Sequence, residues 1–464
     1  MDHRLWTMDY GPTIKSNWSI VHGLLSMVLL LTLTACGTSG TPPPKSSQHT
    51  PPPSSLQKVW EDPEQLFKEA RKNYRAGNYS VVATALERIL TVYPKSSVVP
   101  EAKKMSEEIQ TRLGSAGVKI GVLLPLSGSY ARFGEAVLDG ISCAIGLFDP
   151  CGSNNSKTQI VVRDTKGSPS LAAQEVQDLV EKEKVSAIIG PLLSTEAPGS
   201  AAKAQALQIP MIVLAPQEGV TNAGDFIFQH TLQPQNEVSA LVQEATKEGL
   251  KKFILLYPNN PYGKEYQLLF TNELMQTGAG KVIATKSYSA DLADFNSLIE
   301  ELKLKTVARV GIFIPDSYKE VAEIAQALEM AGIQGPKLFG PSRWYHPNLL
   351  SQKIANLDGA FMDTSFYPDA NREATKFFAD AFLKTYGNSP AWLEAFAYDA
   401  TRLLLNALGP NINHPSTDTR NTLLAIQNFP GVVGSLSWSG QRVSKWPLDI
   451  IAVHENRFQT VSHP

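Results

Sequence analysis

The chain has 464 residues, and its 42 basic and 44 acidic side chains leave a formal net charge of −2. This balance lacks the basic field that nucleic acid attracts and the polybasic patch of a membrane-surface protein, so small molecules and proteins are the expected partners. The length beyond the first 55 residues allows two or three domains with full cores.

An apolar run at Gly23–Ala35 ends directly before Cys36. At about thirteen residues it is too short to cross a bilayer core of ~30 Å, but it has the length of the h-region of a signal peptide. The sequence Leu33-Thr34-Ala35-Cys36 reads as a lipobox. We therefore expect residues 1–35 to be a cleaved signal peptide and Cys36 to carry a lipid anchor. A buried cysteine after a core segment is the alternative, and the tract that follows argues against it.

Residues 36–55 are rich in Pro, Ser and Thr and include Pro42–Pro44 and Pro51–Pro53. A tract of this composition buries too little apolar surface to offset its ordering entropy, so it predicts an extended tether. Gly37, rather than Asp, follows the cysteine. By resemblance to bacterial lipoproteins, this implies a periplasmic protein that is anchored to the outer membrane.

Helical periodicity begins after the tether. Pro63 suits a first helical turn, and apolar residues recur at helical spacing to about Gly77; further helices are expected from about Ser80 and from Val99. The small and aromatic residues across 56–115 resemble one tetratricopeptide repeat plus the first helix of another. Such hairpins bind peptides or proteins, although a structural spacer would look similar. The side chains that a contact surface would use are Arg71, Lys72, Arg75 and Tyr79.

Two cysteines, Cys143 and Cys151, remain beside Cys36. An oxidising compartment allows this pair to form a disulfide across a short loop. Two free thiols facing a metal are the alternative, but nearby histidines are lacking. We therefore predict a disulfide between Cys143 and Cys151.

From Val118 onward, short β-branched runs alternate with amphipathic segments. This alternation predicts an α/β fold with parallel sheets and helices on both faces, and the length favours two lobes. The expected strands are 119–124, 159–163, 185–189, 211–214, 252–257, 281–286 and 309–314. The expected helices are 135–148, 170–182, 195–207, 262–277, 295–302 and 318–330.

In this architecture, ligands bind beyond the carboxyl ends of the strands. The relevant loops are 125–134, 190–195 and 215–220. Gly190 permits a tight turn after a buried strand, and Ser194 is placed to cap the following helix, whose first amides favour a carboxylate. A satisfied cap without a ligand is the alternative for this motif alone.

Taken in order, these loops resemble the branched-chain amino acid (Leu/Ile/Val) receptor family of type I periplasmic solute-binding proteins. The resemblance covers Val118–Gln459 and includes three further pieces: Asn260-Pro261-Tyr262-Gly263, Ala397-Tyr398-Asp399-Ala400 and Gly434-Ser435-Leu436-Ser437-Trp438. It implies a two-lobed, Rossmann-like domain at 118–464. Lobe 1 would comprise about 118–232 and 366–432, and lobe 2 about 233–365 and 433–464.

The resemblance also implies the roles of individual residues toward an amino acid ligand. Ser194 and Ala215 would hold its carboxylate, Tyr262 would cover it, and an acidic residue after a later strand would pair with its ammonium group. The predicted ligand-binding residues are Ser127, Tyr130, Ser194, Thr195, Ala215, Gln217, Tyr262 and Ser342.

Two positions depart from the family pattern. Ser342 stands where the acid is expected, and Gln217 replaces a usual threonine. Burying an ammonium group without a carboxylate is costly. Asp316 is a candidate to compensate, and a standard zwitterionic ligand is in doubt.

The helical segment before a binding-lobe pair resembles a second family, the penicillin-binding-protein activators, which stimulate peptidoglycan synthases by contact. The expected function is therefore activation of a synthase, with a cell-wall peptide or amino acid as a possible ligand. The alternative is a substrate-binding lipoprotein for an ABC permease.

Enzyme motifs are absent from the sequence: it has no Gly-x-Ser-x-Gly elbow, no His-Glu-x-x-His and no Walker-type run. The eight histidines show no ligand spacing, so we predict no metal, no cofactor and no catalysis. Asp139, Asp164 and Asp399 could face a cleft, but solvated helix faces are the favoured interpretation.

Overall fold

The computed structural model describes residues 62–75, 79–113, 118–146, 151, 158–289, 295–302, 309–351, 353–409 and 415–461. The expected signal peptide, Cys36 and the tether lie outside these residues, as do the side chains of Arg75 and Tyr79. Within the described ranges, no helix combines the length and the apolar character needed to cross a membrane.

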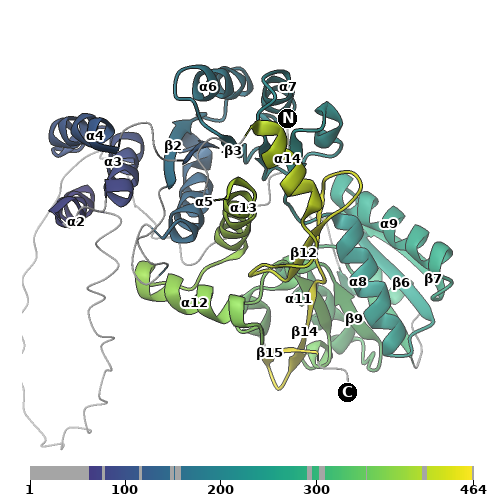
Figure 1. The fold of residues 1–464 in the computed structure, drawn as a ribbon. Coiled ribbons are helices and arrows are strands. Elements are labelled where there is room, and N and C mark those ends of the chain that lie inside the picture. The colour runs from purple at the N-terminus through teal and green to yellow at the C-terminus, as the bar shows by residue number, and fades with distance from the viewer. Residues whose placement is uncertain are drawn as a thin grey trace, which may run out of the picture. The chain divides into compact units, whose positions relative to one another are not determined.

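Three helices form the segment that precedes the first strand, drawn in purple in Figure 1. They are α2 (Pro63–Arg75), α3 (Tyr79–Val92) and α4 (Val99–Leu113), so the helices expected in this segment are confirmed. The central helix α3 packs against both neighbours. The buried apolar residues of these helices include Leu66, Phe67, Ala70, Val82, Ala85, Leu86, Ile89 and Ala102.

The first sheet is wholly parallel, in the order β2-β1-β3-β4-β5. Helices α6 and α7 share a core with it, while α5 and α13 pack on each other and on β1 and β3. The strands are β1 (Val118–Leu124), β2 (Thr158–Asp164), β3 (Ala187–Ile189), β4 (Met211–Val213) and β5 (Ile227–Gln229). The helices are α5 (Ala131–Ala144), α6 (Pro169–Glu181), α7 (Ala197–Ala206) and α13 (Trp392–Leu408).

The second sheet has the order β15-β14-β10-β9-β8-β6-β7. Strand β14 is antiparallel to both of its neighbours, β10 and β15. Helices α8 and α9, labelled in Figure 1, pack on one face. Helices α10 and α11 pack on the other. The strands are β6 (Lys252–Pro258), β7 (Lys281–Tyr288), β8 (Val310–Phe313), β9 (Lys337–Gly340), β10 (Phe361–Thr364), β14 (Asp449–His454) and β15 (Arg457–Thr460). The helices are α8 (Pro234–Lys247), α9 (Pro261–Thr277), α10 (Phe295–Glu301) and α11 (Tyr318–Met330).

The other α-helices are α12 (Glu373–Tyr386) and α14 (Ser416–Ala425), and a small antiparallel sheet consists of β11 (Phe429–Pro430), β12 (Ser435–Trp438) and β13 (Ser444–Lys445). The predicted α/β class, with parallel sheets and helices on both faces, is confirmed. Several boundaries differ from the expectation. The helix expected at 135–148 lies at Ala131–Ala144, the helix expected from Thr195 begins at Ala197, and the strand expected from Val185 begins at Ala187.

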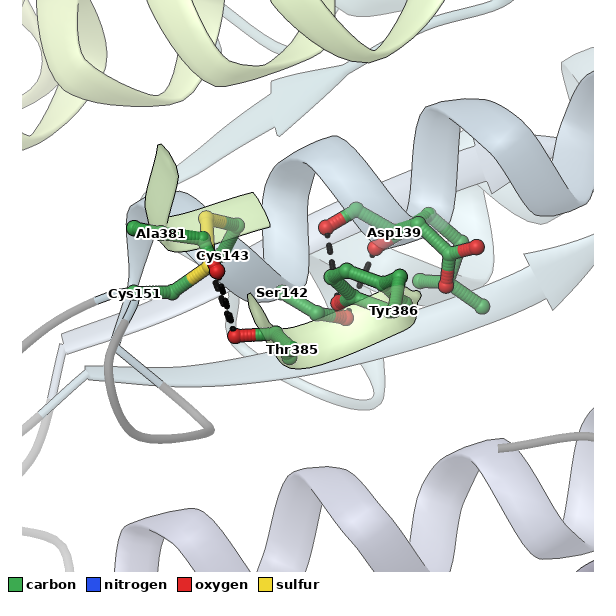
Figure 2. Close-up of a disulfide and its surroundings, with 8 residues drawn as sticks. Asp139, Ser142, Cys143, Cys151, Ala381, Thr385 and Tyr386 are labelled. Carbon is green, nitrogen blue, oxygen red and sulfur yellow. Dashed lines mark hydrogen bonds between the residues drawn. A yellow bond between two sulfur atoms is a disulfide. The ribbon is translucent and has the colours of Figure 1, made fainter. Parts of the chain in front are cut away.

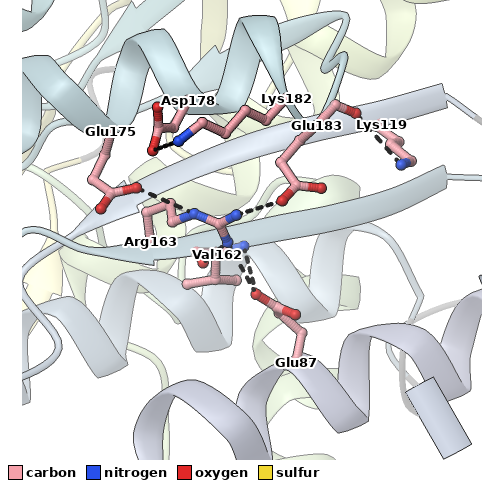
Figure 3. A network of polar contacts seen from close by, with 8 residues as sticks. All are labelled: Glu87, Lys119, Val162, Arg163, Glu175, Asp178, Lys182 and Glu183. Atoms are coloured by element: carbon pink, nitrogen blue, oxygen red, sulfur yellow. Dashed lines mark hydrogen bonds and ion pairs between the residues drawn. The ribbon is translucent and has the colours of Figure 1, made fainter. Parts of the chain in front are cut away.

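The helical segment packs through α3 on β2, the outer strand of the first sheet. Glu87 Oε1 accepts a hydrogen bond from the Val162 amide at 3.3 Å and lies 3.7 Å from the Arg163 guanidinium. Figure 3 shows that Arg163 also pairs with Glu175 at 3.2 Å and Glu183 at 2.6 Å. An outer strand exposes unpaired backbone groups that attract other chains, and α3 covers them here.

A second contact joins α3 to the helices of the first sheet. The Arg88 guanidinium, 6% exposed, pairs with the carboxylate of Asp139 on α5 at 2.5 Å. Tyr386 of α12 donates its hydroxyl to the Asp139 carbonyl at 3.1 Å. The sequence interpretation of Asp139 as a solvated residue is therefore wrong, because its carboxylate is needed to balance a buried cation.

The disulfide between Cys143 and Cys151 lies next to this contact (Figure 2). It links the end of α5 to a residue 8 positions later in the sequence. The Thr385 hydroxyl of α12 approaches Cys151 Sγ at 3.5 Å. The disulfide thus fixes the end of the helix that receives Arg88, and bridges of this kind stabilise a fold by about 2–4 kcal/mol.

We predict that Arg88→Ala lowers the free energy of unfolding by about 3 kcal/mol, because it removes the buried guanidinium that pairs with the Asp139 carboxylate. Limited proteolysis should then cut between α4 and β1 faster than in the wild type. The matched control is Arg71→Ala, whose pair with Glu101 is exposed. Its effect should stay within about 0.5 kcal/mol. Equal effects of the two variants would contradict a buried ionic attachment of α3.

Candidate functional site

The loops at the carboxyl ends of the first sheet form one part of the candidate site. After β3, Gly190 has φ +104° and precedes a cis peptide bond to Pro191. A Cβ atom at this position would lie 2.3 Å from the Leu123 carbonyl oxygen. Only glycine fits both requirements, so the chain turns sharply here and places Ser194 beside the sheet.

Ser194 is 2% exposed, and its Oγ has no hydrogen-bond partner among the residues that the structure describes. The expectation that it caps the next helix is wrong, since α7 starts at Ala197 after Glu196, which makes no side-chain cap. A turn in which the Glu196 amide donates to the Leu193 carbonyl at 3.0 Å separates the serine from the helix. The Ser194 hydroxyl therefore keeps its full hydrogen-bonding capacity.

Glu196 is buried directly after this turn, with no exposed surface. Burial raises the pKa of its carboxyl to about 7 from the usual 4.5. With this pKa the carboxyl is only partly ionised at neutral pH.

The loop after β4 holds two of the predicted ligand residues, Ala215 and Gln217. Ala215 is fully buried, and its amide donates to the Pro191 carbonyl at 3.1 Å. Gln229 of β5 fixes the loop by donating from Nε2 to the carbonyls of Ala215 and Gln217, at 2.8 and 2.9 Å. The backbone of this loop is thus committed to internal bonds, and Gln229 is a supporting residue that the sequence pattern did not reveal.

Three further predicted residues lie on nearby loops. Ser127 and Thr195 are exposed, and Tyr130 is half-buried. A Cβ atom at Gly167 would lie 3.6 Å from the Tyr130 ring and 3.7 Å from the Leu193 side chain. The loops after β1, β2 and β3 therefore meet at one edge.

Tyr262 stands at the equivalent edge of the second sheet. It follows β6 at the start of α9, which Asn260 caps by accepting the Gly263 amide at 2.8 Å. Its ring lies 4.5 Å from the Tyr266 ring. The Arg343 guanidinium carbon lies 4.8 Å from the centre of the Tyr262 ring. Arg343 follows β9, so the ends of two strands meet in a cation–π contact.

Ser342 points inward rather than toward solvent. Its amide and hydroxyl both donate to Glu237 Oε1, at 3.1 and 2.6 Å. The Tyr266 hydroxyl donates to the other oxygen of this carboxylate. Burial raises the pKa of Glu237, and burial together with the Glu237 charge raises the pKa of Asp363 on β10 well above its usual range. The acid that the sequence seemed to lack is thus present, but it lies beneath the serine.

Asp316, the candidate for compensation, is also engaged internally. It accepts hydrogen bonds from the Tyr288 hydroxyl and the Ser317 amide, each at 2.8 Å. Burial raises the pKa of its carboxyl to about 6. Asp316 therefore fixes the loop after β8, next to the Arg343 loop.

The other two acids singled out from the sequence are structural. Asp399 is 1% exposed and accepts the amides of Val432 and Val433 at 2.8 and 3.1 Å. Asp164 ends β2 and accepts the amides of Leu126 and Lys166 at 2.8 and 2.9 Å. Their interpretation as solvated helix residues is wrong, because each carboxylate satisfies backbone donors of a turn.

No group of three or more His, Cys, Asp or Glu side chains in the described ranges is arranged to hold a metal ion. The predicted ligand residues lie in two groups, one at the carboxyl ends of the strands of each sheet. Glu237, Asp363 and Arg343 were missed. Asp363 follows Ala360-Phe361-Met362, and an acid directly after an apolar run is the sequence signal that could have revealed it; Glu237 follows Gln235 and Asn236 and carries no such signal.

Residues 117–441 match the family model described as periplasmic binding protein. The penicillin-binding protein activator LpoA of Mannheimia succiniciproducens is 23% identical over 335 residues, which cover 70% of this chain and 55% of that protein. Leu/Ile/Val-binding protein homolog 7 of Brucella suis is 22% identical over 338 residues, covering 67% of this chain and 82% of that protein. The chain therefore spans only about half the length of the LpoA relative.

Among solved structures, the fold is similar to that of the branched-chain amino acid transporter substrate binding protein LivJ of Streptococcus pneumoniae, in complex with isoleucine. The TM-score is 0.56 at 23% identity, and the match covers 74% of this chain and 99% of that one. At this identity the likeness establishes the fold.

We predict that Glu196 makes stability depend on pH. Because the folded-state pKa lies above the unfolded value, its contribution is complete below about pH 4.5 and is lost as the pH rises through about 7. Denaturant titrations should show that Glu196→Gln removes a stability loss on the order of 2 kcal/mol between pH 5 and 8. Glu181→Gln, at an exposed position of α6, is the control. An unchanged pH slope in Glu196→Gln would refute the role of burial.

Proposed function

The chain belongs to the periplasmic binding protein family, and from this premise we propose that it regulates peptidoglycan synthesis by contacting a peptidoglycan synthase. Family membership implies a periplasmic or envelope location and a Leu/Ile/Val-binding-protein-like module. The synthase contact, a lipid anchor at Cys36 and attachment to the outer membrane are parts of the proposal. So are the division into two lobes and the tetratricopeptide-like character of residues 56–115.

The attachment of α3 to the first sheet is the observation that carries this proposal. A helical segment that served only as a spacer would need no buried ion pair with the binding module. Here Arg88 and Glu87 hold α3 on Asp139 and on β2. The exposed faces of α2 and α4 are thereby fixed relative to the first sheet, as a protein contact surface requires. Similarity to LpoA over 70% of this chain supports the same function.

A transport receptor is the second candidate, and one observation favours it. Ser194 keeps a buried hydroxyl without a partner among the described residues, at the sheet edge where ligands bind in open α/β folds. The similarity to Leu/Ile/Val-binding protein homolog 7 extends over 82% of that protein. In this alternative the chain would deliver a small solute to an ABC permease.

We predict that the double variant Arg71→Glu/Lys72→Glu binds a purified synthase at least fivefold more weakly than the wild type, because both side chains are exposed on α2. Charge reversal is preferable to deletion of residues 56–115, since deletion would leave Asp139 and the edge of β2 uncovered. The readout is crosslinking and the rate of glycan polymerisation.

The matched control is Lys376→Glu/Lys384→Glu, which reverses two exposed charges on α12. It should bind and stimulate the synthase like the wild type. Equal synthase binding by both double variants would show that α2 does not contact the synthase and that the helical segment is a spacer. Recovery of an ABC permease alone would establish the transport alternative.

We also predict that the membrane-extracted protein starts at Cys36 and carries two or three acyl chains there. The apolar run before the cysteine and the lipobox motivate this expectation. Intact mass measurement checks it, with Cys36→Ser as the unlipidated control. A free thiol at Cys36 or a retained Met1 would show that the anchor is absent.

A further inference from the structure

The charges at the two sheet edges are unevenly distributed. Several carboxyl groups that follow or flank the strand ends are directed into the protein. Asp164 and Asp316 accept backbone amides, Glu196 has no exposed surface, and Glu237 accepts hydrogen bonds from Ser342 and Tyr266. Asp363 is fully buried as well. These carboxyl groups thus serve the protein's own donors or lie in its interior, rather than facing an ammonium group.

Arg343 has the opposite arrangement. Its side chain is half-buried, in contrast to the buried Ser342 that precedes it. The two donors of Ser342 fix the backbone on Glu237, so the next residue is held at the end of β9. The guanidinium lies over the Tyr262 ring at the end of β6. The Arg343 guanidinium therefore lies over the ring of Tyr262, which was predicted to cover a ligand.

Contact with the ring leaves the positive charge of the guanidinium in place. Arginine carries five N–H donors in a planar fork that suits a carboxylate, and it stays charged at every physiological pH. Asp316 interacts electrostatically with Arg343 and also accepts hydrogen bonds from Tyr288 and Ser317. A bound carboxylate would be attracted to the guanidinium in competition with Asp316, whereas a bound ammonium group would be repelled by it.

We propose that Arg343 makes this edge a binding site for a small organic carboxylate and excludes ligands with an α-ammonium group at Tyr262. Arg343 is then a specificity-determining residue, placed by Ser342 and Glu237 and oriented by the Tyr262 ring. The inference goes beyond the proposed function, since contact with a synthase requires no ligand. It also contrasts with the LivJ relative, which was solved with isoleucine.

Three probes that share an isobutyl group separate the effects of the two charges. They are L-leucine, 4-methylpentanoate, which lacks the ammonium group, and 3-methylbutylamine, which lacks the carboxylate. Titration calorimetry of the mature full-length chain should give a dissociation constant for 4-methylpentanoate at least tenfold below that for leucine, and no binding of the amine. Acetate, succinate and benzoate complete the panel.

Two variants assign the effect to Arg343. Arg343→Ala should weaken carboxylate binding at least tenfold, and Asp316→Asn should strengthen it by removing a competing negative charge. Arg420→Ala is the matched control, because Arg420 also lies over an aromatic ring, that of Phe226, at 5.3 Å. It should leave the dissociation constant unchanged.

Tighter binding of leucine than of 4-methylpentanoate would overturn the inference and leave the binding module intact. Absence of binding by every carboxylate would overturn it too. Neither result bears on the synthase contact, which is measured without ligand. Loss of that contact with normal carboxylate binding would instead remove the proposed function and leave this inference standing.

Discussion

The attachment of α3 to the outer strand of the first sheet is the constraint on which the rest of this structure depends. Arg88 is buried and therefore requires a negative partner, and Asp139 on α5 provides it. Glu87 satisfies the Val162 amide, a donor on the uncovered side of β2, and it lies near Arg163. These two adjacent residues of one helix thus hold the helical segment on a sheet that would otherwise present an open edge.

This attachment extends through the chain to distant elements. Asp139 also receives the hydroxyl of Tyr386 on α12, whose neighbour Thr385 contacts the disulfide at Cys151. Residues separated by about three hundred positions are therefore coupled through a single carboxyl-bearing residue and its backbone. The helical segment, the first sheet and α12 are thus joined by a continuous set of contacts.

The second sheet is organised by a different set of buried acids. Glu237 gathers the donors of Ser342 and Tyr266, and Asp363 lies close enough to share its electrostatic field. Because these carboxyls are buried, they position a loop rather than present a charge. The side chain left at the end of β9 is Arg343. At the end of β9, Ser342 faces inward to Glu237, whereas Arg343 lies over the Tyr262 ring.

Much of this architecture could be predicted from the sequence. The periodicity after Pro63 and the alternation of β-branched runs with amphipathic segments placed the three helices and the parallel sheets, because these patterns reflect local burial. The strands β5, β9, β10 and β14 escaped prediction, although the equally short β3, β4 and β8 were predicted. Their assignment depends on neighbours that are distant in the chain.

The candidate site was predicted less completely, for a physical reason. The sequence identified loops by their glycines and by the ends of strands, which are local features. It could not show that Ser342 turns toward Glu237, which lies 105 positions earlier. Nor could it show that Ser194 fails to cap α7, because the intervening turn depends on the packing of Leu193. Tertiary contacts decide the direction of a polar side chain, and the sequence alone leaves it open.

Hydrogen exchange at the Val162 amide tests the attachment of α3 most directly. This amide points away from β1 and its acceptor is the Glu87 carboxylate of α3, so its protection reports the attachment of the helical segment alone. A firmly attached helix predicts slow exchange in the intact chain, comparable to that of the paired amides of β1. Exchange of the Val162 amide as fast as that of an unprotected amide, with β1 still protected, would contradict the attachment.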